Sequence, residues 1–115
     1  MSEYIPDRWK LVKLTNSSGK VHFRIFATWG GSYLYGSSWK MSSGCTPDAE
    51  RVLDTNDWNL PQSSGSNYHI RYESEGVCGG WSSVLTTFAD ELEGYGGKLE
   101  IIDSPDFSKL KEEFV

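Results

Sequence analysis

The feature that most restricts the fold is a two-residue alternation in residues 21–27. The apolar set is Val21, Phe23, Ile25 and Ala27, and the residues between them and after them are His22, Arg24, Phe26 and Thr28. Successive side chains of a strand point to opposite faces, so this pattern predicts a strand with one defined buried face. The turn-forming sequence at 16–19, Asn-Ser-Ser-Gly, predicts a hairpin to a preceding strand over residues 9–15.

The buried face of that preceding strand stays open. Trp9 and Leu11 point to one face of an extended chain, whereas Val12 and Leu14 point to the other. Both pairs are strongly apolar. Local alternation therefore does not decide which pair enters the core.

The middle of the chain is read as further short strands separated by turns. A stretch rich in glycine and aromatic residues over 30–44 leaves room for a brief strand at 38–42, and Tyr68, Ile70 and Tyr72 alternate in another. For residues 46–60, Thr46 and Pro47 suit the start of a helix, but the apolar residues that follow suit extended chain as well. We interpret this region as strand, with a loop at 61–66.

The last third of the chain has helical spacing. Apolar residues at 81, 84, 85, 88, 89 and 92 fall on one face of a helix, and Gly94 provides its end. A short strand is predicted over 99–102. Ser104, Pro105 and Asp106 then suit the start of a second helix, with Phe107, Leu110 and Phe114 on one side.

These elements together predict an α+β fold in a single domain spanning residues 1–115. We expect an antiparallel β-sheet, a meander of about 4–5 strands, followed by two C-terminal helices with a short strand between them. The 115 residues, of which 37% are hydrophobic and 14% aromatic, suffice for a real core. A chain of this size buries roughly two thirds of its surface on folding.

The net charge of −5 argues against direct binding to a nucleic-acid duplex, which requires an excess of basic residues. The charge is unevenly divided, because residues 1–47 hold six bases and two acids, whereas residues 48–115 hold five bases and fourteen acids. The two parts either neutralise each other in the fold, which is the simpler interpretation, or leave an acidic face for a basic partner.

No secretory signal or long apolar run is seen, so we expect a cytoplasmic protein that does not contact a membrane. Cys45 and Cys78 are expected to be free thiols rather than a disulfide. No set of residues with metal-ligand spacing is present, and we expect neither a metal nor a cofactor.

The candidate binding site is the aromatic stretch after residue 28, together with the polar face of the preceding strand. Glycine permits close backbone approach, aromatic rings stack on bases, and arginine binds phosphate, which together suit a nucleotide-like ligand. The residues concerned are His22, Arg24, Trp29, Tyr33, Tyr35 and Trp39, joined by His69 and Arg71 if their strand adjoins the first. The competing interpretation is that these aromatic side chains fill the core of a small sheet.

Cys78 lies in a Gly-Val-Cys-Gly-Gly sequence between a predicted strand and a predicted helix. This placement resembles a nucleophile elbow with cysteine in place of serine, and it makes a small hydrolase with a Cys nucleophile an alternative function. Such a mechanism also requires a histidine, and only His22 or His69 is available. A structural cysteine in a short loop is the simpler interpretation.

Residues 4–9, Tyr-Ile-Pro-Asp-Arg-Trp, and residues 29–44, Trp-Gly-Gly-Ser-Tyr-Leu-Tyr-Gly-Ser-Ser-Trp-Lys-Met-Ser-Ser-Gly, resemble small uncharacterised proteins encoded by tailed phages and prophages. In those proteins an aromatic residue and glycines precede Tyr-Leu, and Gly, Ser-Trp, a basic residue and Ser-Gly follow. Cys45 stands where the pattern has an aliphatic residue. The resemblance implies a phage accessory gene and brings no activity and no catalytic residue with it.

We therefore expect a non-enzymatic phage accessory protein that acts in the host cytoplasm. Its expected partner is a small anionic, nucleotide-like ligand or a host defence component, which would make it a counter-defence factor. A protein–protein interaction or virion assembly factor is the alternative outside enzymology. Homo-oligomers are compatible with the sequence.

Overall fold

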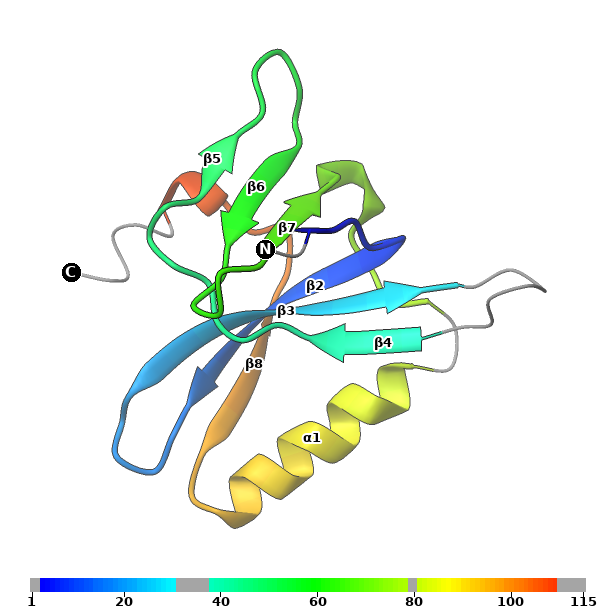
Figure 1. The fold of residues 1–115 in the computed structure, drawn as a ribbon. Coiled ribbons are helices and arrows are strands. Elements are labelled where there is room, and N and C mark those ends of the chain that lie inside the picture. Colours follow the sequence, from blue (N-terminus) through cyan, green and yellow to red (C-terminus); the bar gives the residue numbers. More distant parts are fainter. Residues whose placement is uncertain (1–2, 31–37, 79–80, 110–115) are drawn as a thin grey trace.

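The structure is a computed structural model that describes residues 3–30, 38–78 and 81–109. Within these ranges eight strands form two four-stranded sheets, accompanied by one α-helix (Figure 1). The long sheet has the order β4-β3-β2-β8 and is antiparallel; its strands are β2 (Arg8–Thr15), β3 (Val21–Trp29), β4 (Ser38–Met41) and β8 (Lys98–Ile102).

The short sheet has the order β1-β7-β6-β5. Its strands are β1 (Glu3–Tyr4), β5 (Glu50–Arg51), β6 (Trp58–Pro61) and β7 (Asn67–Ile70), and β1 pairs with β7 in parallel. A 3-10 turn, η1 (Tyr72–Ser74), follows β7 and precedes the helix α1 (Ser82–Gly94). No helix within the described ranges is long and apolar enough to cross a membrane.

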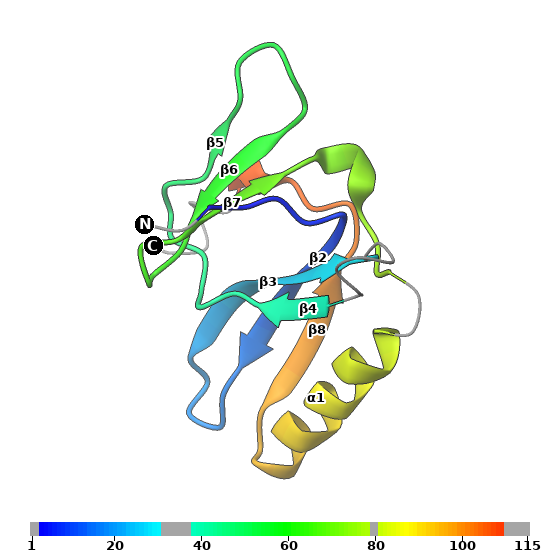
Figure 2. The same cartoon turned by 45° about the vertical axis from the view of Figure 1, so that its right-hand side comes forward.

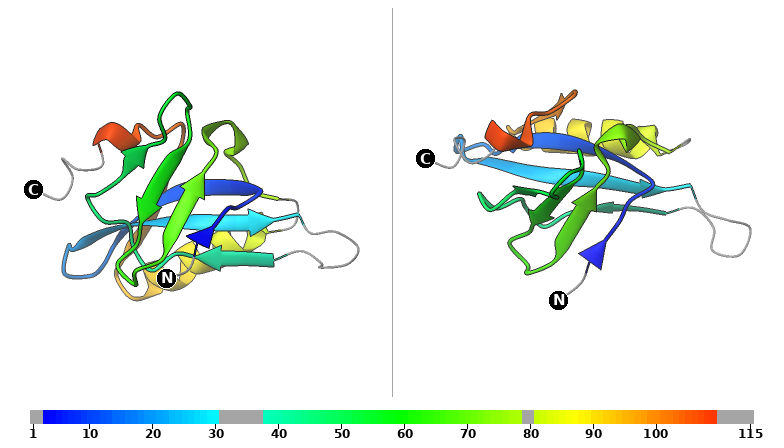
Figure 3. Two further views of the ribbon diagram at one scale, coloured as in Figure 1. Left: turned by 45° about the horizontal axis from the view of Figure 1, so that its top comes forward. Right: turned by 90° about the horizontal axis from the view of Figure 1, so that it is seen from above.

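The elements form three layers, with the long sheet in the middle. The short sheet covers one of its faces and α1 covers the other, as Figures 2 and 3 show from further directions. The core between the two sheets is mainly Trp9, Leu11, Phe23, Ile25, Ala27, Leu60, Tyr68, Ile70 and Phe107. A second core lies under α1 and consists of Val12, Leu14, Phe26 and Leu85 with half-buried neighbours.

This layering explains why the buried face of β2 is ambiguous in the sequence. Trp9 and Leu11 enter the core between the sheets, whereas Val12 and Leu14 enter the core under α1. A strand in the middle layer is buried on both faces, so apolar residues can occupy either face. The neighbouring β3 shows the same property, because Phe26 is buried on the face opposite Phe23.

The predicted α+β architecture, one meander followed by two C-terminal helices with a strand between them, is wrong. The structure is mostly β, with two sheets and a single α-helix among the described residues. After β4 the chain crosses to the second sheet, and an isolated bridge between Cys45 and Gln62 marks the crossing. Alternation indicates which residues of a strand are buried on one face, but it does not indicate which strands pair. In this fold the parallel pairing of β1 with β7 joins segments that are far apart in the sequence.

The second predicted helix is replaced, as far as residue 109, by a loop and one 3-10 turn at 107–109. Ser104 has a φ of 45°, which is not helical. Phe107 is buried, with its ring 5.4 Å from that of Trp9 and 5.6 Å from that of Trp58. The burial of this ring between the sheets determines the path of the chain after β8. Leu110 and Phe114 lie outside the described residues.

Part of the unequal charge of the two parts of the chain is neutralised by ion pairs within the fold. The Nζ of Lys10 lies 2.7 Å from Asp103 and 3.1 Å from Glu75, so a base of the first part meets two acids of the second. The hydrogen bond that the Lys10 ammonium donates to Asp103, reinforced by the one it donates to Glu75, raises the pKa of Lys10 above its ordinary value. This contact ties β2 to the segments on either side of α1.

Candidate functional site

The structure separates the residues of the predicted site. His22 and Arg24 lie on the face of β3 that turns towards α1, opposite Leu14 and Val12 of β2. Trp39 pairs with Thr28, six residues further along β3 than His22. At about 3.3 Å per residue this places His22 about 20 Å from the aromatic end of the strand. A small ligand at Trp39 does not reach His22.

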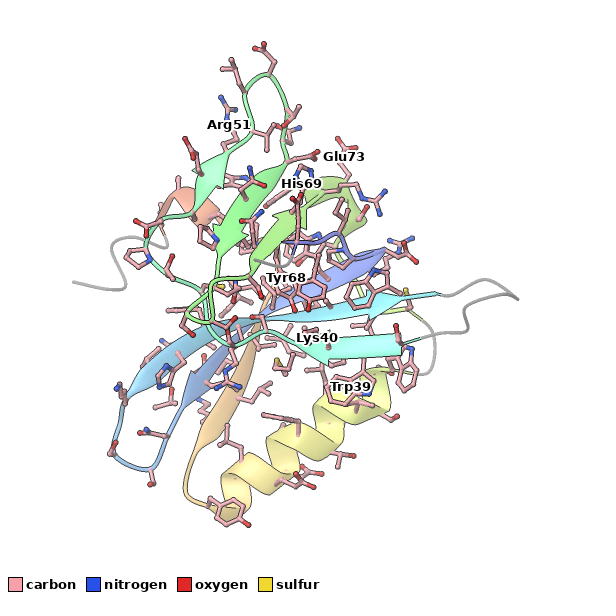
Figure 4. All side chains as sticks on the ribbon, in the orientation of Figure 1. Trp39, Lys40, Arg51, Tyr68, His69 and Glu73 are labelled. Carbon is pink, nitrogen blue, oxygen red and sulfur yellow. The ribbon has the colours of Figure 1, made fainter. Side chains whose placement is uncertain are left out.

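The two tryptophans of the predicted site face opposite sides of the long sheet. Trp29 points towards the short sheet, where its indole N–H donates to the carbonyl of Ile5 at 3.0 Å and its ring lies 6.5 Å from that of Tyr4. Trp39 lies between β4 and α1 and stacks on Phe26, with ring centroids 5.7 Å apart (Figure 4). Tyr33 and Tyr35 lie outside the described residues.

The strand that carries His69 and Arg71 does not adjoin β3. β7 belongs to the short sheet, and the two nitrogens of His69 contact Asp57 Oδ2 at 3.2 Å and Asn59 Oδ1 at 3.3 Å. Arg71 donates to the carbonyl of Pro6 at 3.2 Å. The condition under which these residues would extend the predicted anion site is therefore not met.

Cys78 is held by backbone contacts rather than by catalytic partners. Its N–H donates to the Thr28 hydroxyl at 3.0 Å, and its carbonyl accepts from the N–H of Trp81. His69 is engaged in the short sheet, and His22 lies at the far end of β3 from Thr28. Neither histidine is placed to activate the thiol, so the geometry gives no support to a Cys–His hydrolase.

The two thiols are expected to differ in reactivity. Cys45 is buried, and this burial raises the pKa of its thiol to about 11, whereas Cys78 is half-exposed. Because the thiolate is the reactive form, Cys45 should react with a disulfide reagent at pH 8 only when the protein unfolds. Counting the reactive thiols with and without denaturant checks this. Cys78→Ser is the control, because this variant retains only Cys45 and should show no fast-reacting thiol while it is folded. Fast reaction of that variant would contradict the buried position of Cys45.

A pocket that the sequence reasoning missed lies between the β5–β6 hairpin and the segment after β8. It has a volume of about 510 Å³ and is lined by Arg51, Asn56, Trp58, Tyr72, Pro105, Asp106 and Phe107. Arg51 and Trp58 are cross-strand partners in the short sheet, and Figure 4 shows Arg51 projecting from this hairpin. The pocket volume falls within the range of small-molecule sites.

The apolar lining of this pocket is aromatic and firmly held. The ring of Tyr72 is 6.3 Å from that of Phe107, and its hydroxyl donates to the carbonyl of Pro105 at 2.9 Å. The Trp58 ring also packs on Phe107, with ring centroids 5.6 Å apart. Trp58 and Tyr72 thus give the pocket two aromatic side chains, the kind of group on which a planar ligand stacks.

The polar groups of this pocket have opposite charges. Arg51 is exposed, and its guanidinium has no hydrogen-bond or ion-pair partner among residues 3–30, 38–78 and 81–109. Hydrogen bonds from Ser108 hold the pKa of Asp106 below its ordinary value, so this carboxylate stays ionised at neutral pH. The pocket thus offers a cation, an acceptor for N–H groups and a stacking surface.

The sequence contained only weak signals of this pocket. Trp58 and Tyr72 could be identified as aromatic residues in or near strands, but Pro105 and Asp106 suggest a helix start when read locally. What brings these residues together is the packing of Phe107 between Trp9 and Trp58.

A second, smaller groove of about 270 Å³ lies between Trp39 and α1. Its other lining residues are Ser83, Val84, Thr87, Phe88 and Glu91. Trp39, at 39% exposure, is the most accessible tryptophan described.

Comparisons with protein-family models, with curated proteins and with solved structures found no match to this chain.

Proposed function

We propose that the protein is a non-enzymatic binding module for a small planar, anionic ligand of the nucleotide type. The observation that supports this proposal is the pocket of about 510 Å³ in which Arg51, without a partner among the described residues, lines the same space as the rings of Trp58 and Tyr72. This pocket is not the site predicted from the sequence, but it combines the same kinds of residue, an arginine with a tryptophan and a tyrosine.

The pocket chemistry matches the three parts of such a ligand. A base stacks on the aromatic platform, where each stacked base contributes about 1–3 kcal/mol. The guanidinium of Arg51 binds a phosphate through paired N–H donors. Asp106 accepts a hydrogen bond from an exocyclic amino or ring N–H group, which favours a base over a simple inorganic anion.

A thermal-shift screen of nucleotides and cyclic dinucleotides tests this proposal. A ligand at 100 times its Kd adds about 2.7 kcal/mol of stability. Arg51→Gln should leave the melting temperature of the free protein unchanged, because Arg51 is exposed and has no partner in the part of the chain that the structure describes. It should weaken binding at least about 10-fold, because a hydrogen bond to a charged group contributes about 1.5–3 kcal/mol.

Lys20→Gln is the matched control, because Lys20 is an exposed base in the β2–β3 turn, outside the pocket. Its ligand affinity should equal that of the unmodified protein. A screen with no stabilising compound, or equal stabilisation of the Arg51→Gln variant, would rule out this pocket as the site.

The biological setting of the proposal comes from the resemblance of residues 4–9 and 29–44 to phage and prophage proteins. We propose an accessory protein that acts in the host cytoplasm, where sequestering a nucleotide signal would oppose a host defence. Co-expression with a nucleotide-signalling defence system tests this setting, since the protein should restore phage growth and its Arg51→Gln variant should not.

A further inference from the structure

The strand β4 is an open edge of the long sheet. It pairs with β3 on one side, and no segment among the described residues pairs with it on the other. Edge strands that present unpaired backbone groups are templates for the addition of another strand. The groove between Trp39 and α1 adjoins this edge, because Trp39 belongs to β4, and Figure 1 shows the ribbon of α1 next to that of β4.

The backbone pattern identifies which groups of β4 point away from β3. The N–H of Ser42 donates to the carbonyl of Ile25 at 2.9 Å. Hydrogen bonding alternates along an antiparallel strand, so Lys40 and Ser38 also direct their backbone groups to β3. The N–H and C=O groups of Trp39 and Met41 therefore point to the open edge.

The side chains of these same residues face α1. Met41 packs into the core under the helix, and Trp39 stacks on Phe26 while staying 39% exposed. Lys40 points the other way, with its Nζ 5.1 Å from the ring of Tyr4 (Figure 4). The lysine in the middle of this edge is thus turned away from the groove and does not cover it.

The charge of α1 indicates what kind of segment fits beside β4. The helix contains Asp90, Glu91 and Glu93 and no basic residue, and Glu91 lines the groove. Acidic residues near the C-terminal end of a helix lie at the negative end of its dipole and are unfavourable there. A basic side chain of a partner placed at Glu91 would relieve this interaction.

We propose that β4 and α1 bind an extended, basic segment of a partner protein by strand addition. The segment forms backbone hydrogen bonds with Trp39 and Met41, inserts a large apolar side chain between Trp39 and Phe88, and places a lysine or arginine at Glu91. Main-chain bonds supply affinity and the groove supplies specificity in this mode of recognition. A second copy of this chain fits less well, because each copy has a net charge of −5.

Selection of random linear 12-residue peptides displayed on a particle tests this proposal. The immobilised protein should enrich peptides that combine a large apolar residue with a nearby lysine or arginine. Glu91→Gln should lower the affinity of the protein for an enriched synthetic peptide at least 10-fold. Glu93→Gln is the matched control, because this acid of the same helix does not line the groove, and its affinity should change less than 2-fold.

The backbone bonds are tested on the same peptide. Methylation of alternate peptide nitrogens should abolish binding in one of the two registers, and the bound peptide should slow amide exchange of Trp39 and Met41. No enrichment, equal effects of the two helix variants, or binding that survives methylation in both registers would overturn the proposal. Arg51→Gln should bind the peptide normally, which separates this site from the ligand pocket.

Discussion

Phe26→Ala should lower the free energy of unfolding by about 3–5 kcal/mol, as much as Phe23→Ala. The two residues are on the same strand, three positions apart, and point to opposite faces of β3. Phe23 packs between the two sheets, whereas Phe26 is fully buried under α1. A large loss of stability at both positions is the signature of a sheet that is covered on both sides.

Val21→Ala is the control for this pair. Val21 belongs to the same alternating set as Phe23, but it lies 39% exposed at the end of the strand, so its truncation should cost less than about 1 kcal/mol. Urea unfolding of the three variants measures these differences. A mild effect of Phe26→Ala beside a severe effect of Phe23→Ala would mean that α1 does not cover this face.

Raising the pH from 8 towards 12 should destabilise the protein by several kcal/mol. Burial raises the pKa of Cys45 to about 11 and, with smaller contributions from Tyr4 and Cys45, raises the pKa of Tyr68 to about 12. Their ordinary values are 9.0 and 10.0. Each shift corresponds to about 2–3 kcal/mol of differential interaction between the protonated and ionised forms.

The direction of this effect follows from proton release. Both groups are neutral when protonated and lose their protons at a lower pH in the unfolded chain than in the folded protein. The stability they contribute is fully present below pH 9, declines as the unfolded chain ionises, and is lost near pH 11 for Cys45 and pH 12 for Tyr68. Urea unfolding at a series of pH values, combined with tyrosine absorbance, measures the decline.

Tyr68→Phe is the informative variant for this second test. The Tyr68 hydroxyl is buried and has no hydrogen-bond partner among the described residues. Its removal should therefore leave the stability at pH 7 unchanged or increased, and should weaken the alkaline loss. An unchanged alkaline loss in both Tyr68→Phe and Cys45→Ala would show that other groups cause it.

Elements that depend on local patterns could be predicted from the sequence. The alternation at 21–27 predicts one buried face made of Val21, Phe23, Ile25 and Ala27; the last three lie in the core between the sheets, whereas Val21 is 39% exposed. The helical spacing from residue 81 corresponds to α1, and the strand predicted at 99–102 corresponds to β8. In these cases neighbours in sequence determine the pattern, because the period of a strand or helix is a local property of the backbone.

The candidate site could not be predicted in this way. The aromatic and basic residues of 22–39 are near one another in sequence, yet Trp29 and Trp39 project to opposite faces of one sheet. Arg51 and Asp106 are far apart in sequence and line one pocket.

What the sequence determined by itself is therefore the presence of α1 and of the clearly patterned strands, and one buried face of β3. The tertiary structure alone decided that β2 is buried on both faces, that β1 pairs with β7, and that Phe107 ends between the sheets rather than on a helix. The physical reason is that pairing between distant segments depends on the total apolar surface they bury together. The entropy cost of closing the loop between them rises only slowly with its length, so nearness in sequence gives a pair of strands little advantage over a distant pair that buries more apolar surface.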